Sequence, residues 1–283
     1  MPAEVDLHLH TTESDGRLTP AELVALADKQ GLRVIAITDH DTTSGLDPAW
    51  KAAMAYPGLV VLAGIELSTD VPGNEIHVLG YYIDHQDTSF QMMLYEFRES
   101  RVGRAQKMVE KLGELGMPLE WERVKEIAGQ GSIGRPHVAQ ALLEKGHISY
   151  LQEAFEKYIG RNGPAYVERE KQTPEAAVEL ITNVGGTPVL AHPAQVDNLE
   201  DVLTSLKAVG LKGMEVFYAQ YDQATVARLA ELADKYDLLP CGGSDYHAFG
   251  TPGEPLPGKA GPPMWVAMEL RELAMEQSYG RFG

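Results

Sequence analysis

The sequence predicts an α/β barrel with a helical insertion. Short runs rich in Val, Ile and Leu alternate with helical patterns, which is typical of strand and helix units that close a largely parallel sheet. Between residues 90 and 166 this alternation stops, and apolar residues recur at helical spacing with no strand between them. The chain has 283 residues, 44% of them hydrophobic and 23% charged, so one large core is expected.

The barrel elements can be placed in chain order. The first helix begins at Thr19-Pro20-Ala21-Glu22, which combines an N-cap, a proline at the first helical position and a capping-box glutamate, and Gly31 follows its end. Another begins similarly at Thr173-Pro174 and stops before Gly185-Gly186. Eight apolar runs are expected to be strands: residues 5–9, 33–38, 59–63, 75–81, 187–191, 213–217, 238–241 and 265–268.

Residues 96–166 form the expected insertion, and residues 1–95 and 167–283 form the barrel. Gly116-Met117-Pro118, Gly129-Gln130-Gly131 and Gly146 divide the insertion into helices. Residues 97–170 hold 12 of the 24 basic residues and 11 acidic ones, whereas the remainder holds 12 basic and 30 acidic residues. An anionic substrate is therefore expected to find its cationic contacts in this segment, although solvated helix faces would show the same charges. Residues 250–263 are expected to form a long loop.

Composition excludes some classes of function. The net charge of -17 argues against a protein that coats nucleic acid with a basic surface. No run is long and apolar enough to span a bilayer, and the N-terminus lacks the pattern of a secretion signal, so we expect a cytoplasmic protein. The single cysteine, Cys241, lies in an apolar run and is expected to be a small core residue.

Histidine and carboxylate residues lie at or just beyond the C-terminal ends of the expected strands, where barrel enzymes build active sites. In Val5-Asp6-Leu7-His8-Leu9-His10 the alternation places Asp6, His8 and His10 on one face. Mixed nitrogen and oxygen ligands suit Zn, Mn or Fe, and a bridging carboxylate lets two or more ions sit together. The residues at the expected strand ends are His8, His10, Asp39, His40, Glu66, His192, Asp245 and His247. Two more candidates are His77, within an expected strand, and Asp15, on the turn after the first strand.

Together these residues resemble the motifs of the polymerase and histidinol phosphatase (PHP) family, metal hydrolases related to amidohydrolases with a distorted (β/α)7 barrel. The motifs are His8-Leu9-His10 with Asp15, Thr38-Asp39-His40, Gly64-Ile65-Glu66, His77, Ala191-His192-Pro193 and Ser244-Asp245-Tyr246-His247. The resemblance covers nearly the whole chain and implies two or three divalent ions, manganese first and iron or zinc as alternatives. The ligands that it implies are His8, His10, Asp15, His40, Glu66, His77, His192, Asp245 and His247. His192, Asp245 and Asp39 are the candidates for catalytic proton transfer.

Within the family the chain looks most like the stand-alone TrpH-like branch of nucleoside 3',5'-bisphosphate phosphatases and 5'-3' exoribonucleases. The segment Gly134-Arg135-Pro136-His137 favours this branch, because a proline at a helix start leaves backbone N–H groups free beside a cationic side chain. Arg135 and His137 are therefore expected to bind a second phosphate. A capped helix with an exposed Arg and His is the alternative.

The expected activity is hydrolysis of the 3'-phosphate of a nucleoside 3',5'-bisphosphate, together with cleavage of short 5'-phosphorylated RNA or DNA oligonucleotides. No membrane and no obligate protein partner are expected. Histidinol phosphate phosphatase is the enzymatic alternative, because it needs the metal ligands but no second phosphate site. A non-catalytic, metal-stabilised scaffold and a hydrolase of amides or esters are the remaining hypotheses.

Overall fold

A distorted barrel forms the body of the molecule. The computed structural model describes residues 3–71, 74–168, 172–251 and 253–281. Backbone hydrogen bonds from Leu7 N to Gly242 O (3.2 Å) and from Asp245 N to His8 O (2.9 Å) bring the first strand against the last, so the sheet is nearly closed, as predicted. The strands of the described residues follow one another in the sheet: β1 (Val5–Asp6), β2 (Val34–Ile37), β3 (Val60–Val71), β4 (Asn74–Tyr81), β5 (Thr187–Leu190), β6 (Gly213–Tyr218) and β7 (Leu239–Gly243).

The middle of the sheet departs from a simple parallel barrel. β3 continues well beyond the expected end at residue 63, so Glu66 lies inside a strand and not at its C-terminal end. β4 runs antiparallel to both β3 and β5, whereas the other neighbouring strands are parallel. Because of this reversal, His77 in the first half of β4 pairs with Ser68 in the second half of β3. Glu66 and His77 therefore meet at one rim of the barrel although neither follows a strand.

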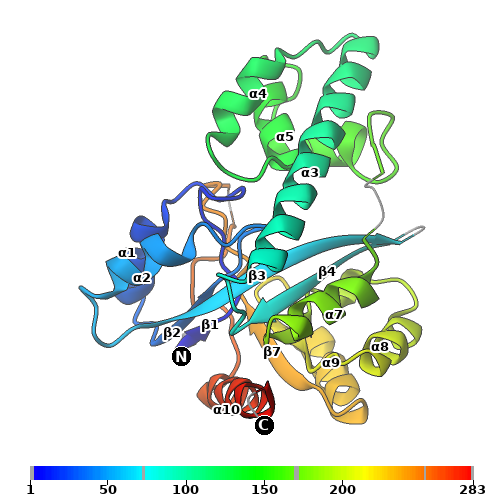
Figure 1. The fold of residues 1–283 in the computed structure, drawn as a ribbon. Helices are drawn as coiled ribbons and strands as arrows, with labels where there is room; N and C mark the ends of the chain where they lie inside the picture. The colour runs from blue at the N-terminus through cyan, green and yellow to red at the C-terminus, as the bar shows by residue number, and fades with distance from the viewer. Residues whose placement is uncertain (1–2, 72–73, 169–171, 252, 282–283) are drawn as a thin grey trace.

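The strand expected at residues 265–268 is wrong. These residues lie in the first turns of α10 (Met264–Arg281), which covers the end of the barrel away from the insertion (Figure 1). Val266, Ala267 and Leu270 are buried and pack in one cluster with the strands. Their spacing is that of one helix face, a period that a four-residue apolar run does not reveal.

Helices cover the outside of the barrel. Thr19 and Glu22 cap the first of these helices reciprocally, as the sequence predicts. No helix in the described part of the chain combines the length and the hydropathy needed to cross a bilayer. The helices around the strands are α1 (Pro20–Lys29), α2 (Leu46–Ala53), α7 (Pro174–Asn183), α8 (Leu199–Ala208) and α9 (Gln223–Lys235), with a short 3-10 turn at Pro193–Gln195.

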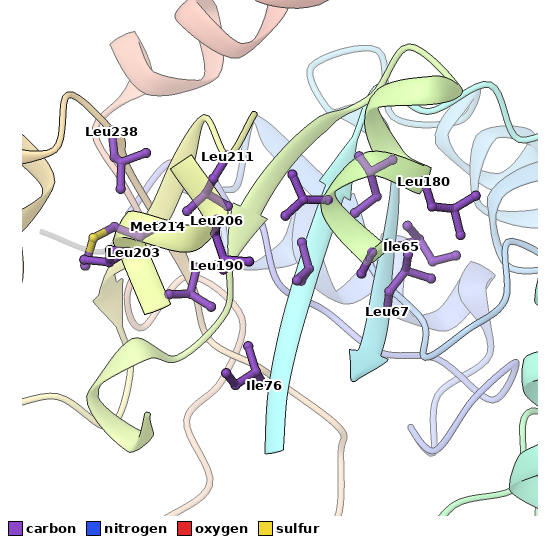
Figure 2. Close-up of a cluster of buried hydrophobic side chains, with 14 of the residues drawn as sticks. Ile65, Leu67, Ile76, Leu180, Leu190, Leu203, Leu206, Leu211, Met214 and Leu238 are labelled. Carbon is purple, nitrogen blue, oxygen red and sulfur yellow. The ribbon is translucent and has the colours of Figure 1, made fainter. Parts of the chain in front are cut away.

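One hydrophobic cluster anchors the strands that carry the site. Figure 2 shows Ile65 and Leu67 of β3 near Leu180 of α7, and Leu203 of α8 near Leu190 and Met214, with Ile76 of β4 in the same buried cluster. The labelled side chains are at most 8% exposed, and burial of an aliphatic side chain stabilises a fold by about 1.5–3 kcal/mol. β3 and β4 thus pack against the outer helices behind the polar rim.

The insertion rises from the barrel on the long helix α3 (Thr88–Glu114) (Figure 1). Phe90 and Leu94 of α3 pack in the barrel core, whereas Met108 and Leu112 pack in a separate core with the other inserted helices. One continuous helix therefore belongs to both parts, and the boundary expected near residue 96 falls inside it. The other inserted elements are α4 (Trp121–Ala128), α5 (Arg135–Glu144), α6 (Leu151–Ala154) and a π-helical turn (Phe155–Ile159).

Candidate metal centre

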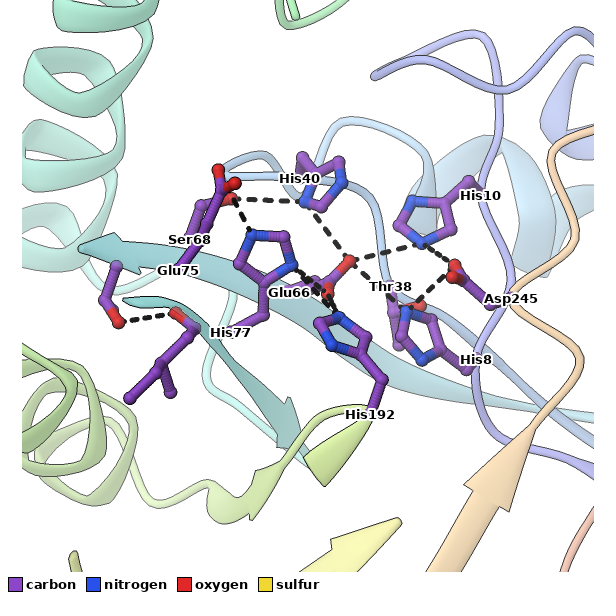
Figure 3. A network of polar contacts seen from close by, with 12 residues as sticks. His8, His10, Thr38, His40, Glu66, Ser68, Glu75, His77, His192 and Asp245 are labelled. Atoms are coloured by element: carbon purple, nitrogen blue, oxygen red, sulfur yellow. Dashed lines mark hydrogen bonds and ion pairs between the residues drawn. The ribbon is translucent and has the colours of Figure 1, made fainter. Parts of the chain in front are cut away.

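Glu66 lies at the middle of a ring of imidazoles at the barrel rim (Figure 3). It is 1% exposed, and its two carboxylate oxygens face five histidines from four segments of the chain. The nearest nitrogen to Oε1 is Nδ1 of His77 at 2.7 Å. The other ring nitrogens within 3.3 Å of the carboxylate belong to His8 (3.2 Å), His10 (3.2 Å), His40 (3.1 Å) and His192 (3.3 Å).

Two further carboxylates extend this cluster on the side of His10. Asp245 Oδ1 lies 3.1 Å from His10 Nε2 and 3.3 Å from His8 Nε2. Asp15 Oδ1 lies 3.4 Å from His247 Nε2 and 3.7 Å from His10 Nδ1. The structure thus brings all nine side chains of the implied ligand set into one connected cluster.

The cluster suits divalent cations. Three groups have ligand atoms within 4.8 Å of one another: His10, Asp15, His40 and His247; His8, His10 and Glu66; and His40, Glu66 and His77. Among the described residues, both ring nitrogens of His10 and Nε2 of His77 are buried without a hydrogen bond of good geometry, although Nε2 of His10 lies close to carboxylates of Asp245 (3.1 Å) and Glu66 (3.2 Å). Buried polar atoms without a partner are costly, and ligation of a cation would satisfy them. The donor set of imidazoles and carboxylates fits manganese, iron or zinc.

Protons and cations compete for these side chains. Burial lowers the pKa of His10, but the carboxylates of Asp245 and Glu66 outweigh burial and raise the pKa to about 10. Glu66 and Glu75 act in the same way on His77, whose pKa rises to about 9 despite burial. His40 behaves differently, since burial dominates and lowers its pKa to about 3. A cation must therefore displace protons from part of the cluster when it binds.

Glu215 on β6 positions two of the histidines, and the sequence reading missed it. It is fully buried, Oε1 lies 3.0 Å from Nδ1 of His8, and Oε2 accepts a hydrogen bond from the backbone N–H of His192 at 2.7 Å. With Nδ1 of His8 donating to Glu215, Nε2 is the nitrogen available to a cation, and it faces Glu66 and Asp245. A lone glutamate within the apolar run of β6 was the available signal, because a buried charge requires partners.

Tyr218, at the end of β6, is a second residue that the sequence reading missed. Its hydroxyl donates to Oδ2 of Asp245 at 2.7 Å, and its ring lies edge-on to His192 with centroids 6.1 Å apart. Burial, together with the charge of Asp245, raises the pKa of Tyr218. The hydroxyl therefore stays protonated and leaves Oδ1 of Asp245 turned toward His8 and His10.

Backbone geometry sets the positions of two expected site residues. His192 (φ 30°) and Asp245 (φ 53°) both adopt left-handed backbone conformations. Such conformations cost free energy in residues other than glycine and cluster at functional sites. Each residue lies two positions after the end of its strand, β5 or β7, and its side chain contacts the cluster at the rim.

Asp39 lies behind the cluster and does not line the cavity at the metal centre. Its carboxylate accepts hydrogen bonds from the backbone N–H (2.7 Å) and hydroxyl (2.7 Å) of Thr11 and from the hydroxyl of Ser14 (2.6 Å). These bonds fix the loop between His10 and Asp15.

A cavity of about 390 Å³ joins the metal cluster to the insertion. Arg101 and Arg104 of α3 and Arg135 of α5 line it together with His40 and Asp245. This volume lies within the range of small-molecule sites in proteins. Three cationic side chains therefore face the same space as the ligand cluster.

The two residues expected to bind a second phosphate lie in different surroundings. Arg135 lines the cavity and donates to Glu75 Oε2 at 2.6 Å. His137 is 7% exposed and does not line this cavity, and its Nδ1 accepts the backbone N–H of Gly134 at 2.9 Å at the start of α5. His137 therefore caps the helix that carries Arg135.

Comparisons with known proteins agree with this geometry. The PHP domain family matches residues 6–163. A 3',5'-nucleoside bisphosphate phosphatase from Chromobacterium violaceum is 32% identical over 287 residues, covering 96% of this chain and 98% of the relative. The 5'-3' exoribonuclease Rnm of Salmonella typhimurium is 36% identical over 248 residues, covering 86% and 84%. A crystal structure of a metal-dependent phosphoesterase from Bifidobacterium adolescentis has 30% identity and a TM-score of 0.87, covering 95% of this chain and 96% of that one.

Proposed function

Because this chain belongs to the PHP domain family and is a metal-dependent phosphoesterase, we propose that it hydrolyses the 3'-phosphate of nucleoside 3',5'-bisphosphates. The products are a nucleoside 5'-monophosphate and inorganic phosphate. Short 5'-phosphorylated oligonucleotides are the second substrate class, in keeping with the exoribonuclease among the relatives. The observation that carries the proposal is the group of arginines that shares one cavity with the metal cluster.

The charges in this cavity favour a second phosphate. Arg101 pairs with Asp41, whereas Arg104 and Arg135 share the single carboxylate of Glu75, with N···O distances of 3.8 Å and 2.6 Å. These three guanidinium groups thus share two carboxylates, so one guanidinium charge has no carboxylate of its own. Nη2 of Arg104 is buried without a hydrogen-bond partner among the described residues, and a phosphate oxygen would supply one. Histidinol phosphate has a single phosphate and would not need these arginines.

We assign the nine side chains of the cluster to two or three divalent cations, with manganese as the first candidate. When bound, the cations would supply a nucleophilic water near neutral pH and neutralise charge on the phosphoryl oxygens. Glu66 lies between the groups of imidazoles and is suited to bridge neighbouring cations. Glu215 and Tyr218 hold His8, His192 and Asp245 in place.

Proton transfer to the leaving 3'-oxygen needs a side chain that reaches the cavity. The side chains of His192 and Asp245 are 11% and 18% exposed, and both line the cavity. We propose that one of them orients the water that donates this proton. Asp39 is 1% exposed and accepts hydrogen bonds from Thr11 and Ser14. These contacts support a role in positioning the loop between His10 and Asp15, and not in proton transfer.

The test compares two substrates with the manganese-loaded protein. Phosphate release is measured from adenosine 3',5'-bisphosphate and from adenosine 3'-monophosphate. Arg135→Ala should lower kcat/KM for the bisphosphate by roughly thirtyfold or more, since it removes a partly buried charge from a phosphate contact. The monophosphate should be affected no more than about threefold, the size of a weak exposed contact. Arg123→Ala is the matched control, because Arg123 is exposed and pairs with Glu126 and Glu144 outside this cavity.

An equal loss on both substrates would reject the role of Arg135 in binding the second phosphate. Failure of the manganese-loaded protein to release phosphate from either substrate would reject the proposed activity itself.

A further inference from the structure

A second cavity of about 470 Å³ opens beside the metal centre. It runs between α6 and the loop after β7, and we call it the side groove, defined by Leu151, Phe155, Phe249, Glu254 and Pro255. Leu151, Glu254 and Pro255 line only the side groove, whereas Phe155 and Phe249 also line the cavity with the arginines. The metal centre therefore lies at the junction of the side groove and the arginine-lined cavity.

The side groove differs in chemistry from the arginine-lined cavity. Asp245 and His247 face both spaces, but no Lys or Arg is among the described residues that line the side groove. Glu254 adds a negative charge, and its carboxylate accepts the backbone N–H groups of Phe249 (2.9 Å) and Gly250 (2.7 Å), which fixes the loop as a wall. The groove is therefore unfavourable for phosphate and favourable for an uncharged group with apolar faces, such as a nucleoside.

We propose that the side groove binds the downstream nucleoside of a 5'-phosphorylated oligonucleotide, the one esterified through its 5'-oxygen to the attacked phosphorus. The inference rests on the proposed function, which places the first nucleotide and its 5'-phosphate in the arginine-lined cavity. With the first nucleotide in the arginine-lined cavity, the second nucleoside of a longer substrate needs the adjoining space. Because Asp245 and His247 line both spaces, a phosphodiester held at the cluster has one nucleoside on each side.

The chemical step is the same for both substrates. A water oxygen bonds to phosphorus, the bond from phosphorus to the 3'-oxygen of the first nucleotide breaks, and that oxygen takes up a proton. A dinucleotide thus yields two nucleoside 5'-monophosphates. With a longer chain, the remainder leaves with a new 5'-phosphate and can bind to the arginines in the next round, so degradation proceeds from the 5' end.

The experiment measures kcat and KM of the full-length, manganese-loaded protein on adenosine 3',5'-bisphosphate and on the 5'-phosphorylated dinucleotide pApA. Leu151→Ala should lower kcat/KM for pApA about tenfold, mainly through KM, because it removes apolar contact with the downstream nucleoside. Leu151→Asp should lower it further, since the added charge faces the substrate. Leu151 also packs on the edge of the insertion core, so the melting temperatures of both variants are compared with that of the wild type, and the comparison of the two substrates is made with the variants that remain folded. Neither variant should change kcat/KM for the bisphosphate by more than about twofold.

Tyr150→Ala is the matched control, because Tyr150 is the neighbouring residue, is 52% exposed and lines neither cavity. Equal losses on both substrates would overturn the inference, because they would assign the side groove to the first nucleotide. Unchanged hydrolysis of pApA by both Leu151 variants would also overturn it. A wild-type protein that hydrolyses the bisphosphate but leaves pApA intact would overturn the inference alone. Hydrolysis of neither substrate would overturn the proposed function as well.

Discussion

Replacing Glu215 by glutamine removes one acceptor from a buried position that needs two. The Glu215 carboxylate accepts hydrogen bonds from Nδ1 of His8 (3.0 Å) and from the backbone N–H of His192 (2.7 Å), whereas an amide has only one oxygen that can accept. If that oxygen accepts from His192, the amide N–H group faces Nδ1 of His8 and requires a lone pair there. The imidazole proton then moves to Nε2, which lies 3.2 Å from Glu66, and this nitrogen can no longer bind a cation.

The opposite orientation of the amide is also unfavourable. Two N–H groups would then face each other at His192, and a buried donor without an acceptor costs about 1–3 kcal/mol. Loss of the outer hydrogen bond to a metal-binding histidine typically weakens metal affinity by roughly 10–100-fold, which corresponds to about 1.4–2.7 kcal/mol. We therefore expect the Kd for Mn²⁺ of Glu215→Gln to rise by roughly 10–100-fold.

Calorimetric titration of the metal-free protein with Mn²⁺ at constant pH measures this change. Glu231→Gln is the control, because Glu231 is an exposed residue of α9 and the substitution makes the same change of charge. The reasoning about His8 would be refuted if Glu215→Gln, folded with the melting temperature of the wild type, bound Mn²⁺ within about threefold of the wild-type affinity.

Three further predictions concern the same rim. His10 and His77, whose pKa values are raised to about 10 and about 9 without a cation, hold protons at neutral pH. Cations displace these protons, so Mn²⁺ affinity should rise about tenfold per pH unit per displaced proton between pH 6 and 8, and a flat profile in a titration series would contradict proton displacement. Gly243→Ala should impair folding and lower the melting temperature, because a Cβ at Gly243 would lie 2.5 Å from the backbone nitrogen of His8; an unchanged melting curve would disprove this packing. Tyr218→Phe should weaken Mn²⁺ binding by roughly tenfold while KM for the bisphosphate changes little, and a change in KM alone would instead assign Tyr218 to substrate binding.

Local pattern was sufficient to predict the barrel and the helical character of the insertion. The capping box at Thr19 and the alternation around His8 and His10 depend on neighbours within a few residues, so the sequence reveals them directly. The prediction of a strand at residues 265–268 was wrong because it too relied only on neighbouring residues. Four apolar residues fit both periods, and only the stripe that continues to Leu270 indicates a helix.

Features that depend on contacts between distant segments could not be predicted. Glu66 was expected at a strand end, but the antiparallel hairpin of β3 and β4 carries it and His77 to the rim from inside the sheet. Arg101 and Arg104 occur in an ordinary charged helix pattern, and only the docking of α3 over the cavity brings them beside Arg135. Such placements follow from tertiary packing, which a single sequence does not display.

The proposed chemistry requires that the carboxylate of Glu66 and the surrounding imidazoles hold divalent cations. Anomalous diffraction at the manganese absorption edge, from crystals grown with Mn²⁺, tests it most directly. We expect at least two strong peaks within coordination distance of Glu66, one of them shared with His8 and His10 and another with His40 and His77. Crystals that bind manganese elsewhere, or show no anomalous peak beside Glu66, would contradict it.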